Sequence, residues 1–336
     1  MSMGGVERGV LEISSYLKEK GHEPVIMCAG GKLTEALRGK GIEVILEPCL
    51  LSKNPINIFF LVPWKLLQAI RRFGIHIVHA RSRTSAWSTW IACRISGTRY
   101  LTTHHGAYSL TKGFWKRAMA RPMLWGQLKI VLWKGRLVET KAVIIPRGID
   151  TSQFQISEDN ISVAKCFAMK WNLYDSKLRT VLLPGRVSRI KGQLDFIRAL
   201  VSIFLRPFRV MISIADTLTS SMQTSNIQGD REGPCIINIE RLMPLAGRLR
   251  RECGLSCQLE EQIHPDEMPG ALLCADVVVI PSLTDETFCR AVIEALAMGK
   301  IVVAYEGGGI SEIRDFLRDE IDALSEEIQS SLEVVN

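Results

Sequence analysis

Residues 281–312 read PSLTDETFCRAVIEALAMGKIVVAYEGGGISE, and this stretch decides the fold of the chain. The apolar run ADVVVI before it and the run IVVA within it are typical of strands buried on both faces. Between them, residues 290–298 have the apolar spacing of a helix that ends at Gly299, and the glycines at 307–309 open a second helix. This order predicts a parallel α/β unit, in which ligands bind beyond the carboxyl ends of the strands.

Two carboxylates give this unit a candidate chemistry. Glu286 lies in the predicted loop after the first strand and Glu294 lies on the helix, so both can face one crevice. Carboxylates accept hydrogen bonds from sugar hydroxyls, and the free N–H groups of a helix N-terminus bind phosphate. The same spacing also fits two solvated acids that are favoured at a helix start by its dipole. Spacing alone therefore leaves a sugar-phosphate site and a solvated surface as alternatives.

The whole string resembles the donor-binding signature of the retaining family 4 glycosyltransferases, which have the GT-B fold. The matching pattern is PS-x3-E-x-F-x5-EA-x3-G followed by GG-x2-E. The resemblance implies that Glu286 contacts the transferred sugar and that Glu294 holds the ribose hydroxyls. It also places Phe288, Cys289 and Arg290 at the donor site. The family usually has glycine at the position of Cys289, where we expect a side chain to crowd the backbone approaching the diphosphate.

Composition bounds the class of protein. The 336 residues suffice for two domains, and 47% hydrophobic with 23% charged residues predict a globular chain. No apolar run is long enough to span a bilayer, and no signal-peptide pattern opens the chain. The nine cysteines are scattered, with no second pair to complete a zinc site beside Cys253 and Cys257. We therefore expect free thiols and a cytoplasmic location.

The net charge of +7 is unevenly distributed. Residues 51–150 hold 17 Lys and Arg but only 2 Asp and Glu, which fits nucleic acid, anionic lipid or a phosphorylated acceptor as partner. Because no nucleic-acid-binding motif accompanies this charge, we expect lipid or acceptor and no nucleic acid. The stretch 54–74, NPINIFFLVPWKLLQAIRRFG, fits either an ordinary packing helix or an interfacial helix on an anionic bilayer.

The first half adds to the same resemblance. Gly4-Gly5 opens an amphipathic helix, and Gly5 is our candidate for close approach to the donor phosphate. The run HARSR…TTHHGAY resembles the family's acceptor domain, which implies that His105 lies against the donor sugar. The strand that the family has before Gly4, and the helices that it has after Asn336, are absent from the pattern. We expect a chain of this extent to have weak activity or none.

The second half supplies the diphosphate contacts. The run KAVIIPRGIDTSQF resembles the crossing between domains, so we expect an acceptor-side domain at 1–150 and a donor-binding domain at 151–336. In RTVLLPGRVSRIKGQLDF, the G-R-x4-K-G match implies that Arg186 and Lys191 grip the donor diphosphate. Residues 118–140 and 215–265 have no clear pattern, and the residues that contact the base stay unassigned.

Together these features predict an α/β GT-B fold with two Rossmann-like parallel-sheet domains. The implied reaction moves a hexose from a nucleotide diphosphate sugar to a glycan or lipid-linked acceptor of the bacterial envelope, lipopolysaccharide included, with retained configuration. Glu286 and His105 would position the sugar for catalysis. No D-x-D triplet occurs, so we expect neither a metal nor another cofactor. We expect the enzyme to be cytoplasmic and peripheral at the inner face of the cytoplasmic membrane.

A non-catalytic reading stays open. Cys289, the missing strand and the two unpatterned stretches also fit a degenerate, truncated GT-B remnant that binds only nucleotide or membrane. A GT-B epimerase fits the pair Glu286 and Glu294 less well than a transferase does.

Overall fold

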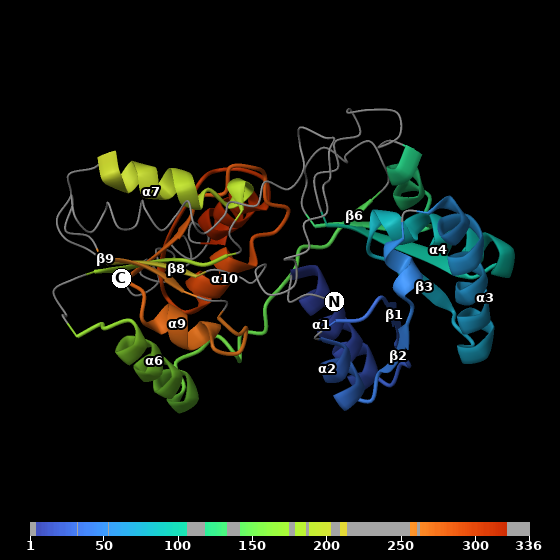
Figure 1. The fold of residues 1–336 in the computed structure, drawn as a ribbon, viewed down its shortest axis with the longest axis horizontal. Helices are drawn as coiled ribbons and strands as arrows, with labels where there is room; N and C mark the ends of the chain where they lie inside the picture. The colour runs from blue at the N-terminus through green and yellow to red at the C-terminus, as the bar shows by residue number, and fades with distance from the viewer. Residues whose placement is uncertain are drawn as a thin grey trace, which may run out of the picture. The chain divides into compact units, whose positions relative to one another are not determined.

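The computed structural model describes residues 5–31, 33–52, 54–105, 118–132, 142–174, 179–185, 188–202, 209–213, 256–260 and 263–320. The chain forms two compact units, Met1–Pro146 and Arg147–Asn336. The predicted boundary near Asp150 lies close to this division. The strands of both units pair in parallel, and helices pack beside them (Figure 1), which confirms the predicted α/β class. No helix among the described residues is long and apolar enough to cross a membrane.

The described residues of unit 1 form two parallel sheets. Helix α1 (Gly5–Glu19) precedes β1 (Val25–Cys28), which pairs with β2 (Glu43–Leu46) across the connecting helix α2 (Leu33–Gly39). The second sheet has the order β3-β4-β5-β6, built from Ile77–Ala80, Arg99–His104, Leu128–Val131 and Val143–Ile144. Among the described strands, β1 and β3 do not pair with each other, so the two sheets are separate.

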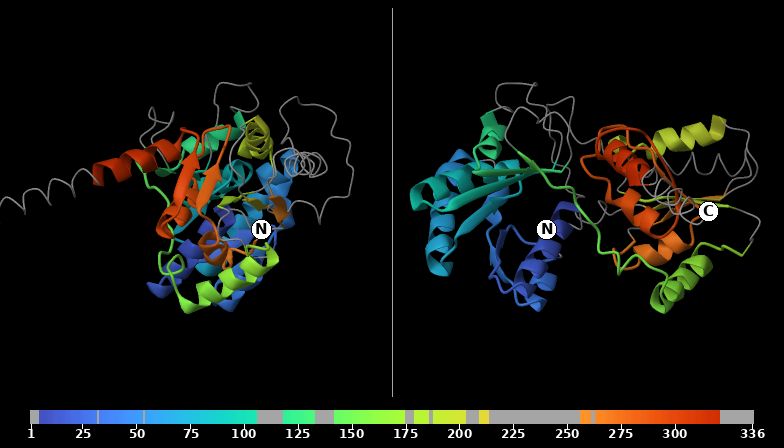
Figure 2. Two further views of the ribbon diagram at one scale, coloured as in Figure 1. Left: turned by 90° about the vertical axis from the view of Figure 1, so that its left-hand side faces the viewer. Right: turned by 180° about the vertical axis from the view of Figure 1, so that it is seen from behind.

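Helices are layered on the larger sheet of unit 1. Helix α4 (Arg83–Ser96) packs on β3 and β4, and α3 (Val62–Phe73) lies against α4 (Figure 2). Before α3 come η1 (Pro48–Leu51) and the π-helical turn η2 (Asn57–Leu61). Val62, Leu66 and Ile70 on the inner side of α3 form a core cluster with Ala92. The stretch 54–74 is therefore helical with one face packed into unit 1.

Besides the helical residues 118–120, the described part of the unpatterned stretch 118–140 contains two short elements. These are η3 (Arg121–Leu124) and β5, which extends the sheet beyond β4. Gly126 between them leaves little room for a side chain, because a Cβ there would lie 3.0 Å from the Leu128 carbonyl oxygen. The strand has only four residues, which is why its period is difficult to recognise in the sequence.

Unit 2 is a doubly wound parallel sheet with the order β11-β10-β7-β8-β9. Its strands are β7 (Thr180–Leu183), β8 (Arg209–Ser213), β9 (Ser256–Glu260), β10 (Val277–Ile280) and β11 (Ile301–Ala304). From β7 the chain adds β8 and β9 on one side, then returns to add β10 and β11 on the other. The winding therefore reverses between β7 and β10, which pair directly. Such a reversal opens a ligand crevice at the carboxyl ends of the two strands.

Helices cover both faces of this sheet. Helix α7 (Gln193–Ser202) lies on one face, and α6 (Glu158–Lys170) and α9 (Met268–Leu273) lie on the other (Figure 1). Trp171, Leu182, Leu272 and Val278 are completely or almost completely buried in the core between the sheet, α6 and α9. Helix α10 (Arg290–Ala297) follows β10 as predicted and is terminated at Gly299, whose φ is +67°. Residues 309–320 form a further helix.

Candidate functional site

The candidate site of unit 2 lies where the winding of the sheet reverses. One loop follows β7 and ends in the short helix η4 (Arg189–Lys191), and the other joins β10 to α10. Because β7 and β10 are adjacent and parallel, both loops leave the sheet at the same edge. Lys191 comes from the first loop and Glu286 from the second.

Lys191 and Glu286 form an ion pair across the two loops. The Lys191 Nζ atom lies 2.5 Å from Glu286 Oε1, and the Ser282 hydroxyl donates to the same oxygen at 2.7 Å. The Lys191 and Glu286 side chains are 25% and 20% exposed, so the pair is half-buried but reachable from solvent. The sequence predicted both charged residues. It did not single out Ser282, although this residue belongs to the PS pair that opens the deciding stretch.

Backbone contacts lock the two loops together. Gly192, at φ +70°, packs so closely on Pro281 that a Cβ would overlap the proline carbonyl oxygen. Next to this contact, the Leu283 N–H donates to the Ile190 carbonyl at 2.8 Å. The position of Lys191 relative to Glu286 is therefore fixed by the backbone as well as by charge.

The glycines at 307–309 hold the other side of the Glu286 loop. A Cβ on Gly308 would overlap the Glu286 carbonyl oxygen, and the Gly309 N–H donates to that same oxygen at 2.6 Å. A Cβ on Gly309 would lie 2.7 Å from the Thr287 carbonyl oxygen. The sequence predicted only that these glycines open a helix. The structure shows that they also make room for the loop that carries Glu286.

Glu294 is engaged on its own helix. Its Oε1 atom lies 3.3 Å from Arg290 Nε, one helical turn away, and these side chains are only 12% and 10% exposed. The pair sits at the start of α10, whose cap residue Cys289 makes no side-chain hydrogen bond to the first turn. Free N–H groups at such a turn attract anions. The predicted donor residues Arg290 and Glu294 thus lie beside a helix N-terminus.

The Cys289 side chain occupies the core, which differs from the crowding that we expected at the loop surface. It is 4% exposed and belongs to the hydrophobic cluster that also contains Val292 and Ala295. Burial raises the pKa of its thiol to about 11, so the group is neutral near pH 7. Its neighbour Phe288 is half-buried in the same loop. The side chain at 289 therefore fills space beneath the loop.

Of the remaining predicted residues, His105 and Gly5 belong to unit 1 and Arg186 lies outside the described residues. His105 directly follows β4, and Gly5 is the first residue of α1. The ring Nε2 of His104, the last residue of β4, lies 3.1 Å from the Met123 carbonyl oxygen. His104 is buried, and this burial lowers its pKa.

His79 is a further histidine of unit 1, and the sequence did not mark it as functional. It lies on β3, and its Nε2 atom is 2.7 Å from Thr103 Oγ1 on β4. Burial, and secondarily the charge of Arg81, lowers its pKa to about 4. The only sequence signal was its place in the run HIVHARSR. No cluster of three metal-ligating side chains occurs among the described residues of either unit.

Comparison with known proteins adds a sequence signal in each half. Residues 3–153 match the family model described as Glycosyltransferase Family 4, and residues 243–333 match the model described as Glycosyl transferases group 1. A lipopolysaccharide 1,2-N-acetylglucosaminetransferase of Salmonella typhimurium is 28% identical over 183 residues, or 54% of this chain. The matched region spans 42% of that relative, less than half of its length.

Solved structures match over nearly the whole chain. A glycosyltransferase from Rickettsia africae has a TM-score of 0.71 and 26% identity, covering 92% of this chain and 78% of its own. Anabaena HepE, solved in complex with UDP-glucose, has a TM-score of 0.70 and 19% identity, covering 92% and 79%. The likeness of fold therefore extends through both units.

Proposed function

We propose that this chain, which belongs to the family 4 glycosyltransferases and has their GT-B fold, transfers a hexose from a nucleotide diphosphate sugar to an envelope acceptor. The observation that carries the proposal is the pairing of Lys191 with Glu286 at the winding reversal of unit 2. This crevice combines a cation for phosphate, a carboxylate for hydroxyls and a nearby helix N-terminus.

The reaction breaks the bond between the anomeric carbon and the diphosphate oxygen, whose electron pair leaves with the diphosphate. The acceptor oxygen forms the new bond to that carbon and passes its proton to the departing diphosphate. Lys191, Arg186 and the N–H groups at the start of α10 would stabilise the departing negative charge. Glu286 would accept hydrogen bonds from the sugar, and Glu294 from the ribose. His105 of unit 1 is proposed as a further catalytic residue.

Three finer points belong to this proposal. The acceptor attacks on the face from which the diphosphate leaves, so the anomeric configuration is retained. Lys191 and Arg186 supply the charge that a divalent metal gives in enzymes with a D-x-D motif, so no metal is needed. The acceptor is a glycan or lipid-linked molecule, used in the cytoplasm at the inner face of the membrane. The Salmonella relative, named as a lipopolysaccharide transferase, supports this acceptor class.

The test is a donor panel assayed for released nucleoside diphosphate. UDP-glucose and UDP-N-acetylglucosamine come first, because the Anabaena neighbour was solved with UDP-glucose and the Salmonella relative is named for N-acetylglucosamine. We expect weak but measurable release with at least one donor, unchanged by a chelator and lost in Glu286→Ala. Proton NMR of the product then reads the anomeric configuration. Calorimetric donor binding without any release supports a non-catalytic, nucleotide-binding remnant instead. Absence of binding to any donor contradicts both the transferase and the nucleotide-binding remnant.

A further inference from the structure

Exposed apolar side chains gather on one part of unit 1. Ile56, Phe60, Trp64 and Ile95 are 65%, 72%, 55% and 63% exposed. With neighbours that include Phe59 and Ile91, they line an apolar groove of about 550 Å³ between η2, α3 and α4. We call these six residues the aromatic face. Contiguous apolar surface of this kind marks an interaction site more often than single exposed residues do.

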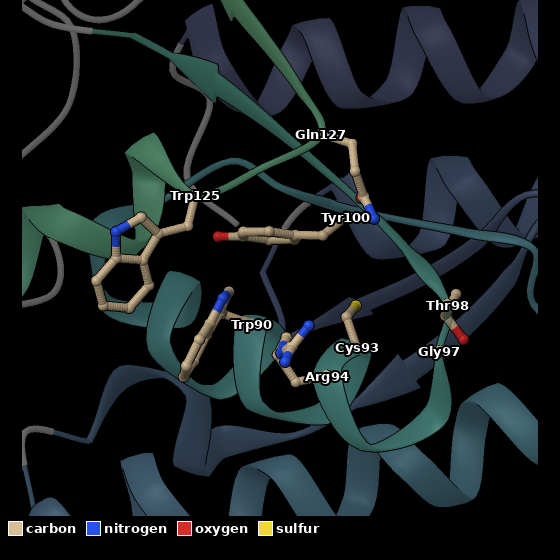
Figure 3. A pocket seen from close by; sticks show the side chains of 8 residues that line it. All are labelled: Trp90, Cys93, Arg94, Gly97, Thr98, Tyr100, Trp125 and Gln127. Carbon is tan, nitrogen blue, oxygen red and sulfur yellow. The ribbon is translucent and has the colours of Figure 1, made fainter.

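Tryptophans extend the aromatic face around α4. The Phe59 ring lies 5.4 Å from Trp87, and the Trp87 ring lies 5.3 Å from Trp125. Trp125 and Trp90 in turn are 4.7 Å apart and line a hollow of about 420 Å³ beside Arg94 (Figure 3). Trp rings combine an apolar body with a polar N–H, which suits the boundary between lipid and water.

Apart from Glu47, which is buried in an ion pair with Lys65 of α3, the charges around the aromatic face have one sign. No Asp or Glu occurs between Glu47 and Glu139, a stretch that contains the whole aromatic face. Arg71, Arg72 and Arg94 are exposed here, as is Arg121 on η3. Trp64 and Arg71 are two helical turns apart on α3, and residues at this spacing share one side of a helix. A partner for this surface must therefore be apolar where the groove lies and anionic beside it.

We propose that the aromatic face docks unit 1 on a lipid bilayer leaflet that contains anionic lipid. Phe60 and Trp64 enter the acyl-chain region, and the groove between α3 and α4 accommodates acyl chains. Arg71, Arg72 and Arg94 lie at the phosphate headgroups. This docking rests on the proposed function in one respect, because it identifies the surface that would hold the enzyme at the membrane. The surface itself belongs to unit 1 alone, and docking requires no sugar transfer.

Vesicle flotation of the full chain tests this docking. Binding to vesicles of phosphatidylcholine and phosphatidylglycerol should be strong at low salt and fall as salt is raised. Arg71→Gln with Arg72→Gln should weaken partitioning about thirtyfold, since each basic residue near an anionic leaflet contributes roughly a factor of five. The matched control, Lys18→Gln with Lys40→Gln, changes two lysines that are exposed elsewhere on unit 1 and should bind like the wild type.

A second pair of variants tests the aromatic contact. Phe60→Ser with Trp64→Ser should lower partitioning by about tenfold or more. The control is Ile156→Ser with Tyr174→Ser in unit 2, where the side chains are 74% and 75% exposed, and it should have no effect. Thermal melts and donor calorimetry establish that both variants are folded.

Several results would overturn the docking. Equal binding to pure phosphatidylcholine vesicles excludes the anionic requirement, and no binding to either vesicle excludes the surface. A dimer in sedimentation experiments that Phe60→Ser dissociates, without vesicle binding, assigns the face to a second copy instead. Because flotation uses no donor, absence of sugar transfer leaves the docking result standing, and the reverse also holds.

Discussion

Lys191 Nζ and Glu286 Oε1 meet at 2.5 Å across the point where the sheet of unit 2 reverses its winding. Each side chain neutralises the other in the chain without ligand. A nucleotide diphosphate sugar offers both of them replacement partners, phosphate for the ammonium and hydroxyls for the carboxylate. Donor binding at this site therefore replaces the ion pair with contacts to the donor. Because the backbone holds both loops in place, the two side chains can change partners without a large movement of the loops.

Losing one cation at the diphosphate should make the second loss less damaging. We expect Lys191→Ala and Arg186→Ala each to lower kcat, and the double variant to lose much less than the product of the two single effects, because both cations act on one leaving group. Lys191→Ala also leaves Glu286 without the ammonium that pairs with it, so the KM of this variant for the donor should rise as well. Steady-state kinetics of the four proteins measures the coupling. Independent multiplication of the two losses contradicts a shared diphosphate.

The contact of Gly192 with Pro281 should be essential for the site. Gly192→Ala adds a Cβ that overlaps the Pro281 carbonyl oxygen and also strains a residue at φ +70°. Gly299→Ala is the matched control, since Gly299 has φ +67° but a Cβ there would meet no atom of the described residues within 4 Å. We expect the control to lose about 1 kcal/mol of unfolding free energy and Gly192→Ala roughly 1–3 kcal/mol more, together with donor affinity. Equal melts and equal calorimetric affinities would show that the loops do not depend on this contact.

Local sequence predicted the parts of the site that lie within one loop and its helix. The apolar run, the loop acids and the helix were predicted because strand, loop and helix periods are local properties. The joining of Lys191 to Glu286 follows from the strand order, and the contact of Gly308 with the Glu286 carbonyl is a long-range packing contact. His79 was missed for the same reason, since its burial depends on β4.

Glu294 should contribute to donor binding even though Arg290 already engages it. We expect Glu294→Ala to weaken donor affinity by roughly 1.5–3 kcal/mol, the usual loss for a charged hydrogen-bonding group. The variant also leaves the nearly buried Arg290 without its carboxylate, so a melt must show how much stability is lost. Glu306→Ala removes an exposed acid that pairs with Arg314 and serves as the control. Unchanged calorimetric affinity in folded Glu294→Ala protein would refute the ribose assignment.

Cys289 should matter for stability and little for donor binding. Its side chain fills the core beneath the loop, so Cys289→Gly opens a cavity and frees the backbone. We expect a loss of about 1–3 kcal/mol in unfolding free energy, about half of it in Cys289→Ala, with donor affinity unchanged in both. Denaturant melts and calorimetry measure these effects. A gain in donor affinity on restoring glycine would support the crowding that the sequence suggested.

The stability of unit 1 should depend on pH through His79. Its pKa is about 4 in the folded chain, below the ordinary value of 6.5, so the unfolded chain binds more protons between these values. The contribution of neutral His79 to the free energy of unfolding is therefore complete above about pH 6.5 and is lost as pH falls towards 4. The total loss is about 3 kcal/mol. His104, whose pKa is also lowered by burial, acts in the same direction.

Comparing thermal melts of the wild type and His79→Gln at pH 7 and pH 5 isolates this effect, because carboxylates that titrate in the same range cancel in the difference. Glutamine keeps a polar group near Thr103 but has no proton to gain, so the variant should lose less stability on acidification than the wild type. His76→Gln, at an exposed position just before β3, should behave like the wild type. If His79→Gln and the wild type lose stability equally between these pH values, His79 is not held neutral by the fold.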